Sequence, residues 1–444
     1  NAWTRLFNAS TSTWTTTSPV GRQTTLTIDS AGRPTQVSVP NVNPVGFSYD
    51  PHGRITTMTQ GSRTWTTGYD AQGFVSSVTD PLGHAVSYVN DPVGRPTQTT
   101  LPDSRVLGMS YDGNSNTTAI VLPSTETHDF AFTPVDLLGT YTPPSIDSSS
   151  PATTYGYDHD RELTSVVRPD GVTVTYGYDS AGRLQSTSYP QGTLSRVYDV
   201  STGQLKTLTA ASGEALAYAY DGFLRKGVTW SGPVGGSLSF GFDNNFRVTS
   251  QTVNGTALSF GYDLDGLLTS AGQLALVPDA HNGKLTGTTF GSLTDSYTYD
   301  TNGLFASYTA SYAGSALYTE SVQRDPVGRI TQKTETIGGV THVFGYTFDA
   351  SGRLTDVTED GQPVSHYGYD ADDNRTTFTG PNGTINPTYD AQDRLLTYGS
   401  ATYAYTENGE LASKTVGGQT TSYTYDALGN LLHVTLPSGE NIDY

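Results

Sequence analysis

The sequence has no cysteine and very little lysine. Its 444 residues include five lysines, and charged residues make up 15 % of the chain, against about 25 % in a typical globular protein. Without cysteine there can be no disulfide framework, thiolate zinc site or cysteine nucleophile. No stretch approaches the roughly 18 consecutive apolar residues of a membrane-spanning helix, so we expect no membrane span.

The charges that are present are mostly acidic. There are 42 Asp and Glu residues against 23 Lys and Arg, which gives a net charge of −19. Phosphate binding needs a basic patch, so we expect no nucleic acid on the outer surface. Residues 1–20 lack a basic start followed by an apolar run, so no signal peptide is visible. Because the first residue is Asn1, we expect the natural N-terminus to lie upstream.

A short period runs through the whole chain. An aspartate, usually preceded by an aromatic or aliphatic residue, recurs every 16 to 25 residues, most often every 20 to 22. Threonine takes its place at Thr133 and Thr406. The aspartates stand at positions 29, 50, 70, 91, 112, 158, 179, 199, 221, 243, 263, 279, 300, 325, 349, 370, 390 and 426. A fixed period of this kind predicts a repeat protein, and 29 tyrosines and 15 phenylalanines in register argue against disorder.

Each copy combines a strand with a turn. In Tyr176-Gly177-Tyr178-Asp179 the two aromatic rings are two residues apart, so they share one face of a strand. The aspartate carboxylate can accept a backbone hydrogen bond two residues on, and the glycine of Asp-x-x-Gly supplies a positive φ. The turn anchors that we single out are Asp29, Gly32, Asp50, Gly53, Asp70, Gly73, Asp91, Gly94, Asp179, Gly182, Asp325, Gly328, Asp349, Gly352, Asp426 and Gly429.

Some copies lack the turn glycine. Ser115, Asp136, Asp373 and Asp393 stand in its slot, and aspartate tolerates the left-handed region. Arg161 and Phe246 occupy the same slot and do not fit this turn chemistry.

A β-branched run follows each turn, and a second turn closes the unit. The sequence therefore predicts an all-β protein, an array of about twenty antiparallel β-hairpins. We expect residues 1–444 to form one repeat body, with irregular joints near 142–154, 270–283 and 301–324, where the composition or the period changes.

Few residues are candidates for chemistry. Asp-Pro-x-Gly occurs at Asp50, Asp80, Asp91 and Asp325. The motif could indicate self-cleavage, but the favoured interpretation is that proline suits the second position of the repeat turn. Asp112-Gly113-Asn114-Ser115-Asn116 begins like a calcium loop but lacks the loop's glycine and bidentate glutamate. Weak calcium candidates are Asp263, Asp265, Asp370 and Asp372, although solvated turn carboxylates are the simpler interpretation. We therefore expect no metal and no cofactor.

No enzyme motif stands out. The eight histidines show no metal-ligand spacing, and no Gly-x-Ser-x-Gly, Walker or dinucleotide motif occurs. Arginine often stands four residues after the anchor aspartate. A row of arginines could bind a ligand, but a turn-stapling ion pair worth at most about 1 kcal/mol is favoured. These pairs are Asp29/Arg33, Asp50/Arg54, Asp91/Arg95, Asp179/Arg183, Asp325/Arg329, Asp349/Arg353 and Asp390/Arg394.

The tyrosine–aspartate anchor, with Gly-Arg and then a β-branched run, resembles the YD repeat of the Rhs family of bacterial proteins over essentially the whole chain. Residues 141–144, 332–339 and 423–431 resemble stretches just ahead of the Rhs core. The resemblance implies a spiral β-sheet shell, or partial cocoon, around a C-terminal toxin that is released by aspartyl self-cleavage in the core. We expect the core, the toxin and any N-terminal module to lie outside Asn1–Tyr444.

The predicted function is thus non-enzymatic: a shell module of an Rhs-type polymorphic toxin that encapsulates and protects a toxin polypeptide. Its partners would be that toxin and the remaining segments of the same protein, with self-assembly as an option, at a secreted or bacterial cell-surface location. The alternatives are an extracellular filament or glycan-binding adhesin built of YD repeats and, less favoured, a glycan hydrolase on a β-scaffold.

Overall fold

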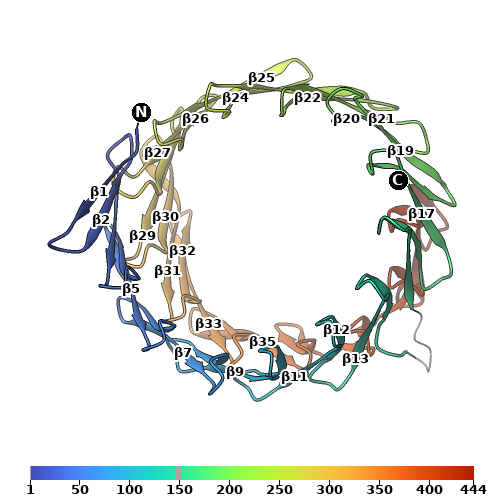
Figure 1. Ribbon diagram of the computed structural model, residues 1–444, viewed down its shortest axis with the longest axis horizontal. Helices are drawn as coiled ribbons and strands as arrows, with labels where there is room; N and C mark the ends of the chain where they lie inside the picture. The colour runs from blue at the N-terminus through green and yellow to red at the C-terminus, as the bar shows by residue number, and fades with distance from the viewer. Residues whose placement is uncertain (1, 147–151) are drawn as a thin grey trace. The chain divides into compact units, whose positions relative to one another are not determined.

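The chain is all-β. The computed structural model describes residues 2–146 and 152–444, and in these ranges it contains 44 strands and no helix (Figure 1). Strands that follow one another in sequence pair antiparallel, as in β1–β2, β2–β3 and β17–β18, except that β37 and β38 belong to different sheets. The predicted array of antiparallel hairpins is therefore confirmed. No helix among the described residues is long and apolar enough to cross a membrane.

The strand bounds follow the repeat period. The first ten are β1 (Thr4–Asn8), β2 (Thr13–Thr17), β3 (Gln23–Ile28), β4 (Pro34–Val39), β5 (Val42–Tyr49), β6 (Ile55–Gln60), β7 (Arg63–Tyr69), β8 (Val75–Thr79), β9 (Ala85–Asn90) and β10 (Pro96–Thr100). The next are β11 (Val106–Tyr111), β12 (Thr117–Val121), β13 (Thr127–Phe132), β14 (Leu138–Thr142), β15 (Thr153–Tyr157), β16 (Leu163–Val167), β17 (Thr173–Tyr178), β18 (Leu184–Tyr189), β19 (Gly192–Tyr198), β20 (Leu205–Thr209), β21 (Ala215–Asp221), β22 (Leu224–Ser231) and β23 (Gly236–Phe242).

The later strands are β24 (Val248–Val253), β25 (Thr256–Tyr262), β26 (Leu268–Ala271), β27 (Leu274–Pro278), β28 (Leu285–Phe290), β29 (Leu293–Tyr299), β30 (Phe305–Tyr312), β31 (Ser315–Arg324), β32 (Ile330–Ile337), β33 (Val340–Phe348), β34 (Leu354–Glu359) and β35 (Gln362–Tyr369). The last are β36 (Arg375–Gly380), β37 (Gly383–Ile385), β38 (Thr388–Tyr389), β39 (Leu395–Tyr398), β40 (Ala401–Tyr405), β41 (Leu411–Val416), β42 (Gln419–Tyr425), β43 (Leu431–Thr435) and β44 (Asn441–Asp443).

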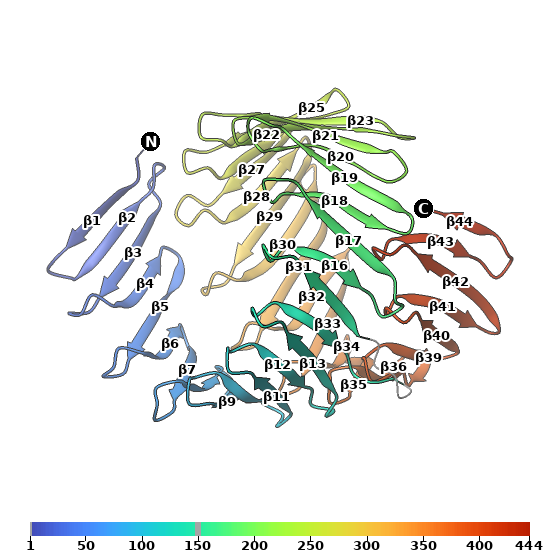
Figure 2. The same cartoon turned by 45° about the vertical axis from the view of Figure 1, so that its right-hand side comes forward.

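The strands belong to two compact units. Unit 1 comprises Asn1–Ser104, Gly241–Thr252 and Thr256–His366, and unit 2 comprises Arg105–Phe240, Val253–Gly255 and Tyr367–Tyr444. Each unit thus combines hairpins from the first part of the chain with hairpins from the later part. Figure 2 shows consecutive neighbouring strands in both, for example β1–β5 in unit 1 and β39–β44 in unit 2.

The irregular joints expected from the sequence differ among themselves. Residues 270–283 include the end of the four-residue strand β26 and all of the five-residue strand β27. Residues 301–324 include β30 and β31, which are longer than average at eight and ten residues. The hairpin persists in both places and only its length changes. Residues 147–151 of the joint at 142–154 lie outside the described residues.

The two faces of the sheet carry different side chains. In unit 2, Val166 on β16 is paired with Tyr155 and Val174, while its neighbour Ser165 is paired with Gly156 and Thr175. Successive residues of a strand point to opposite faces. One face therefore carries aromatic and aliphatic side chains, and the other carries Ser, Thr and Gly.

A glycine between two aromatic residues keeps the small-residue face tight. Gly177 lies opposite Ser186, and a Cβ on Gly177 would meet the Ser186 Oγ at 2.6 Å. The same contact would occur at Gly156, Gly241 and Gly261, and at Gly68, which follows Thr67, each against a serine Oγ. The glycine of the aromatic–Gly–aromatic–Asp pattern thus gives the opposite serine room that a larger residue would take.

A β-bulge stands beside the repeat turn. Tyr178 is paired with Leu184 and Gly177 with Ser186, so Gln185 is an extra residue in the strand that leaves the turn. The same shift occurs at Tyr49, Tyr69 and Tyr157. A bulge bends its strand and increases its twist, so each repeat adds a local bend at this end.

Very few side chains are deeply buried. Among the described residues no side chain falls below 2 % exposure, and the buried apolar residues are Val174, Ala401, Ala427 and Val434. Most strand residues are half-buried instead. The fold is therefore held by hydrogen-bonded ladders and contacts along the aromatic face rather than by an enclosed hydrophobic core.

Candidate functional site at the contacts between sequence-distant repeats

The repeat turn is organised around its aspartate carboxylate. At Asp50 one oxygen, Oδ1, accepts the backbone N–H of His52 and of Arg54, both at 2.9 Å. The other oxygen accepts the Arg54 Nε–H at 2.7 Å. The backbone completes the turn, because Gly53 N–H donates to the Asp50 carbonyl at 3.0 Å. Only a short carboxylate side chain reaches all these donors at once.

The eight predicted aspartate–glycine anchor pairs share this geometry. In each, the glycine N–H donates to the aspartate carbonyl at 3.0–3.1 Å. Their glycines have positive φ: Gly32 80°, Gly53 84°, Gly73 97°, Gly94 90°, Gly182 74°, Gly328 102°, Gly352 88° and Gly429 83°. Asp80 forms the same turn between β8 and β9. This turn therefore also closes a hairpin at the end opposite the periodic aspartate turns.

The copies without glycine keep the same backbone. Asp136, Ser115, Asp373 and Asp393 have φ of 61°, 74°, 72° and 59°. Arg161 and Phe246, which do not fit the turn chemistry, also adopt φ of 66° and 63°. The ladders on both sides of the turn therefore impose the left-handed conformation even on residues that disfavour it.

The arginine after each turn also links one repeat to the next. The Arg54 guanidinium lies 4.2 Å from the centre of the Tyr69 ring, one repeat later, and the Tyr69 hydroxyl donates to the Ile55 carbonyl at 2.8 Å. The sequence pattern indicated the Asp–Arg pairs but not the following ring. The same stacking joins Arg33 to Tyr49, Arg183 to Tyr198, Arg247 to Tyr262, Lys284 to Tyr299, Arg329 to Phe348 and Arg394 to Tyr405.

These contacts keep the turn carboxylates ionised. The backbone N–H of Arg54 is the largest influence that holds the pKa of Asp50 below its ordinary value of 3.8, and the guanidinium adds to it. Asp29 and Asp179 have lowered pKa values through their own arginines, Arg33 and Arg183.

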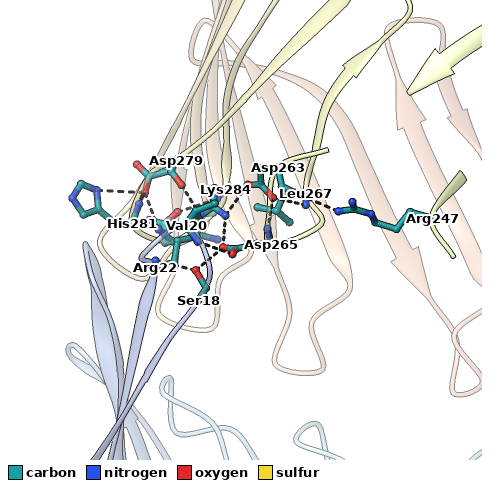
Figure 3. Close-up of polar contacts among 11 residues, drawn as sticks. Ser18, Val20, Arg22, Arg247, Asp263, Asp265, Leu267, Asp279, His281 and Lys284 are labelled. Carbon is teal, nitrogen blue, oxygen red and sulfur yellow. Dashed lines mark hydrogen bonds and ion pairs between the residues drawn. The ribbon is translucent and has the colours of Figure 1, made fainter. Parts of the chain in front are cut away.

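A second set of contacts joins repeats that are far apart in sequence. In unit 1 the Arg22 guanidinium lies 2.8 Å from the Asp263 carboxylate and 2.6 Å from that of Asp265 (Figure 3). Its Nε–H donates to the Asp279 carbonyl at 3.1 Å. Ser18 Oγ–H donates to Asp265 at 2.6 Å. The turn between β2 and β3 is thus fastened to two repeat turns about 240–260 residues later.

We call the contacts between repeats that are far apart in sequence seams. Burial alone would raise the pKa of Asp265, but hydrogen bonds from Ser18 and Arg22 outweigh burial and lower it. The Arg22 side chain is only 14 % exposed. The ion pair is therefore largely shielded from solvent, and removal of one partner should destabilise the protein more than it would at an exposed pair.

Unit 1 has further seams. Arg63, at the start of β7, donates to the carbonyls of Pro326 and Val327 at 2.7 and 3.1 Å. Asn43 Nδ2–H donates to Asn302 Oδ1 at 2.9 Å. In these contacts a hairpin end opposite the periodic aspartate turns meets one of those turns from a distant repeat.

Unit 2 repeats the arrangement with its own residues. Arg105 donates to the Ala371 carbonyl at 2.6 Å and pairs with Asp373 at 2.8 Å. Arg168 pairs with Glu410 and donates to the Asp426 carbonyl at 3.2 Å. Sequence reasoning missed these seam arginines, Arg22, Arg63, Arg105 and Arg168. The available signal was that they lie at hairpin ends, outside the slot four residues after an anchor.

The four weak calcium candidates belong to turns and seams. Asp263 and Asp265 face Arg22, a cation supplied by the chain itself. Asp370 Oδ1 accepts the backbone N–H of Asp372 at 3.0 Å, and Asp372 Oδ1 accepts that of Ser124, also at 3.0 Å. The structure gives each of them a partner from the protein.

The Asp-Pro-x-Gly copies at Asp50, Asp80, Asp91 and Asp325 all form turns of the repeat type. Asp112 does too, because its Oδ1 accepts the backbone N–H of Asn114 and Asn116, both at 2.9 Å. Local geometry therefore accounts for these motifs.

The family comparison agrees with the repeat geometry. Residues 1–444 match the model of the family described as Teneurin YD-shell, which confirms the YD-repeat resemblance. Teneurin-3 of Danio rerio is 25 % identical over 457 residues, which cover 94 % of this chain and 17 % of the relative. Teneurin-4 of Homo sapiens is 25 % identical over 425 residues, covering 91 % and 15 %. The chain spans less than a fifth of the length of these relatives.

Two other matches are more remote or shorter. The tRNA3(Ser)-specific nuclease WapA of Bacillus spizizenii is 32 % identical over 108 residues, which cover 22 % of this chain and 5 % of that protein. Among solved structures, the "Crystal Structure of TcdB2-TccC3" aligns over 97 % of this chain and 32 % of that chain, at 14 % identity and a TM-score of 0.47.

Proposed function

This chain belongs to the teneurin YD-shell family, and on that basis we propose that it forms part of the wall of a shell that encloses a polypeptide. The seams suit a wall, because they fasten sequence-distant repeats together through ion pairs and hydrogen bonds of largely buried arginines. Within residues 2–146 and 152–444, ladder pairing joins only strands that are neighbours in sequence, so contacts of this kind would hold repeats from distant parts of the chain in one wall.

The observation that carries this proposal is the difference between the two faces of the sheet. Aromatic and aliphatic side chains gather on one face, and the described residues contain almost no deeply buried side chain. The aromatic face is half-buried rather than deeply buried, so it can still contact an enclosed, incompletely folded polypeptide, because such a chain exposes apolar side chains of its own.

The enclosed polypeptide would be a toxin of the Rhs type. The net charge of −19 favours a basic cargo through charge complementarity. The local match to a bacterial protein named as a tRNA-specific nuclease supports a nuclease cargo. In this role the module acts without catalysis at a secreted or bacterial cell-surface location, and other segments of the natural protein complete the enclosure.

A second candidate is an extracellular filament or glycan-binding adhesin. It is favoured by an apolar pocket of about 410 Å³ in unit 2, lined by Leu194, Leu208, Leu216 and Trp230. Tryptophan beside apolar side chains can stack on the ring of a sugar. A glycan array distinguishes this candidate from the shell. An adhesin should bind a glycan saturably and lose that binding in Trp230→Ala, whereas a shell module should show no such binding.

Protease protection tests the proposed function. The natural full-length protein is digested under native conditions, and the rate of cleavage of each segment is compared with the rate after denaturation. The shell predicts that a segment outside residues 1–444 survives native digestion and is cleaved rapidly after denaturation. If every segment outside the module is cleaved at the same rate in both states, the encapsulation role is wrong.

A further inference from the structure

One imidazole and two carboxylates converge in unit 1, outside the seams. His342 Nδ1, on β33, lies 3.1 Å from Glu359 Oε1 and 3.2 Å from Asp360 Oδ2. The three ligand atoms all lie within 4.8 Å of one another, and among the described residues no other group of three or more His, Asp or Glu side chains does this. The sequence gives no hint of it, because His342 is 17 residues from Glu359.

The backbone fixes how Asp360 faces this cluster. Asp360 has a φ of 50° in an Asp-Gly turn, and its N–H donates to the Val343 carbonyl at 2.7 Å. Its Oδ1 accepts the Val343 N–H at 2.8 Å. One carboxylate oxygen is therefore held by the backbone, and the other is directed at His342. A hydrogen bond that orients a ligand in this way is typical of metal sites.

The two carboxylates have no strong cationic partner. Asp263 and Asp265, which are also close together, share the Arg22 guanidinium. In the described part of the chain neither Glu359 nor Asp360 is paired with a lysine or an arginine, and His342 is their only ion-pair partner. The nearby lysine, Lys333, is engaged by Glu335 at 2.6 Å. With a neutral imidazole, two negative charges remain uncompensated.

The spacing suits a small divalent ion. Zinc binds histidine nitrogen at about 2.0–2.1 Å and carboxylate oxygen at about 2.0–2.2 Å, so neighbouring ligand atoms of a tetrahedral site lie roughly 3.3 Å apart. The separations of His342 Nδ1 from the two carboxylate oxygens, 3.1 and 3.2 Å, are close to this value, and the two oxygens lie within 4.8 Å of each other. A nitrogen ligand also favours zinc or a similar transition metal over calcium, which prefers oxygen ligands.

We propose that His342, Glu359 and Asp360 bind a divalent transition-metal ion such as Zn²⁺. The side chains are 38 %, 38 % and 51 % exposed, so the ion can enter from solvent and water can fill its remaining position. The bound ion joins the start of β33 to the turn between β34 and β35. It thereby cross-links two adjacent hairpin ends, whether or not the module encloses a cargo.

Metal titration tests this site. Tag-free protein is titrated with Zn²⁺ by calorimetry at pH 7.5, and Co²⁺ is added separately to record its visible absorption. We expect one equivalent of Zn²⁺ to bind, and at least tenfold weaker binding in His342→Gln and in Asp360→Asn. The asparagine keeps an oxygen for the Val343 N–H and tolerates positive φ, so its circular dichroism and melting temperature should match those of the wild type.

The chain offers two matched controls. His366 pairs with Asp356 at 2.7 Å and His433 with Asp443 at 2.6 Å, each with a single carboxylate. His366→Gln and His433→Gln should bind Zn²⁺ within twofold of the wild type. The proposal is wrong if no saturable binding occurs up to millimolar Zn²⁺, if His342→Gln binds as tightly as the wild type, or if a control variant loses binding to the same extent.

Discussion

The two ends of most hairpins differ in their side chains, although several opposite ends, such as Ser18–Arg22, form the same backbone turn. The repeat end is nearly constant, with an aspartate, a positive φ three residues later and a bulge beside it. The opposite end varies, and in the first part of the chain it carries the seam arginines Arg22, Arg63, Arg105 and Arg168. In the later part the opposite ends contain neither lysine nor arginine at residues 210–214, 232–235, 254–255, 291–292, 313–314, 338–339, 360–361 and 417–418.

This difference separates two tasks. The repeat end makes every hairpin alike and offers carboxylates and carbonyls on its turn. The opposite end decides whether a hairpin is fastened to a distant repeat, and arginine does this because its guanidinium donates to several acceptors at once. An arginine at the opposite end thus marks several of the hairpins that take part in seams, and Asn43 shows that an amide side chain can also do so.

Removal of a seam arginine should have the largest effect. Arg22→Ala leaves Asp263 and Asp265 facing each other without a cation, so we expect a loss of about 2–4 kcal/mol in the free energy of unfolding. Arg33→Ala, at the constant end, removes a pair whose arginine is 37 % exposed and should cost under about 1 kcal/mol. Chemical denaturation measures both, and equal losses would contradict the division between the two ends.

Disruption of the constant end should come next. Gly182→Val places a β-branched residue at a φ of 74° and should destabilise unit 2 by about 1–3 kcal/mol. Gly113 is the control, because its φ is not positive and an added Cβ would meet nothing within 4 Å. Gly113→Val should have the same free energy of unfolding as the wild type. A loss of stability in Gly113→Val as large as in Gly182→Val would show that turn strain is not the cause.

Acid should loosen the seams, but only at low pH. The pKa values of Asp263 and Asp265 are lowered from 3.8, so the folded state binds fewer protons than the unfolded chain. Their stabilisation is therefore complete above the unfolded pKa and is lost as pH falls through the folded one. We take the seam contribution as the melting temperature of the wild type minus that of Arg22→Ala. This difference should be equal at pH 7 and pH 5 and should shrink below about pH 3.8. A contribution that shrinks between pH 7 and 5 would argue against it.

Relief of strain at one turn should have the smallest effect. Phe246 is 70 % exposed and has a φ of 63°, so Phe246→Gly removes left-handed strain at the cost of backbone entropy. We expect a net stabilisation of about 0.5 kcal/mol. Phe223, which is 99 % exposed without a positive φ, is the control, and Phe223→Gly should give no gain. Thermal unfolding of both variants decides whether the strain is real.

The repeat end could be predicted from sequence because its determinants are local. Asp50, Gly53 and Arg54 act within five residues, so their spacing predicts the turn and the Asp–Arg pair. The stacking on Tyr69 is harder to predict, because it depends on how successive hairpins lie side by side.

The seams and the His342 cluster could not be predicted, because their partners are brought together by the sheet. Arg22 and Asp263 are 241 residues apart, and no local pattern relates them. Phe246 shows the reverse case, where the local preference is clear and the flanking ladders override it.

Cross-linking across a seam tests most directly whether repeats that are far apart in sequence lie in contact. The sequence contains no cysteine that could compete with the two introduced thiols. Asn43→Cys with Asn302→Cys places two thiols where the wild-type side chains are 2.9 Å apart. Asn43→Cys with Ser292→Cys moves the second thiol to the opposite end of β29. We expect efficient cross-linking of the 43/302 pair by mild oxidation or a short bismaleimide, and very little for 43/292. Equal yields, or a higher yield for 43/292, would contradict it.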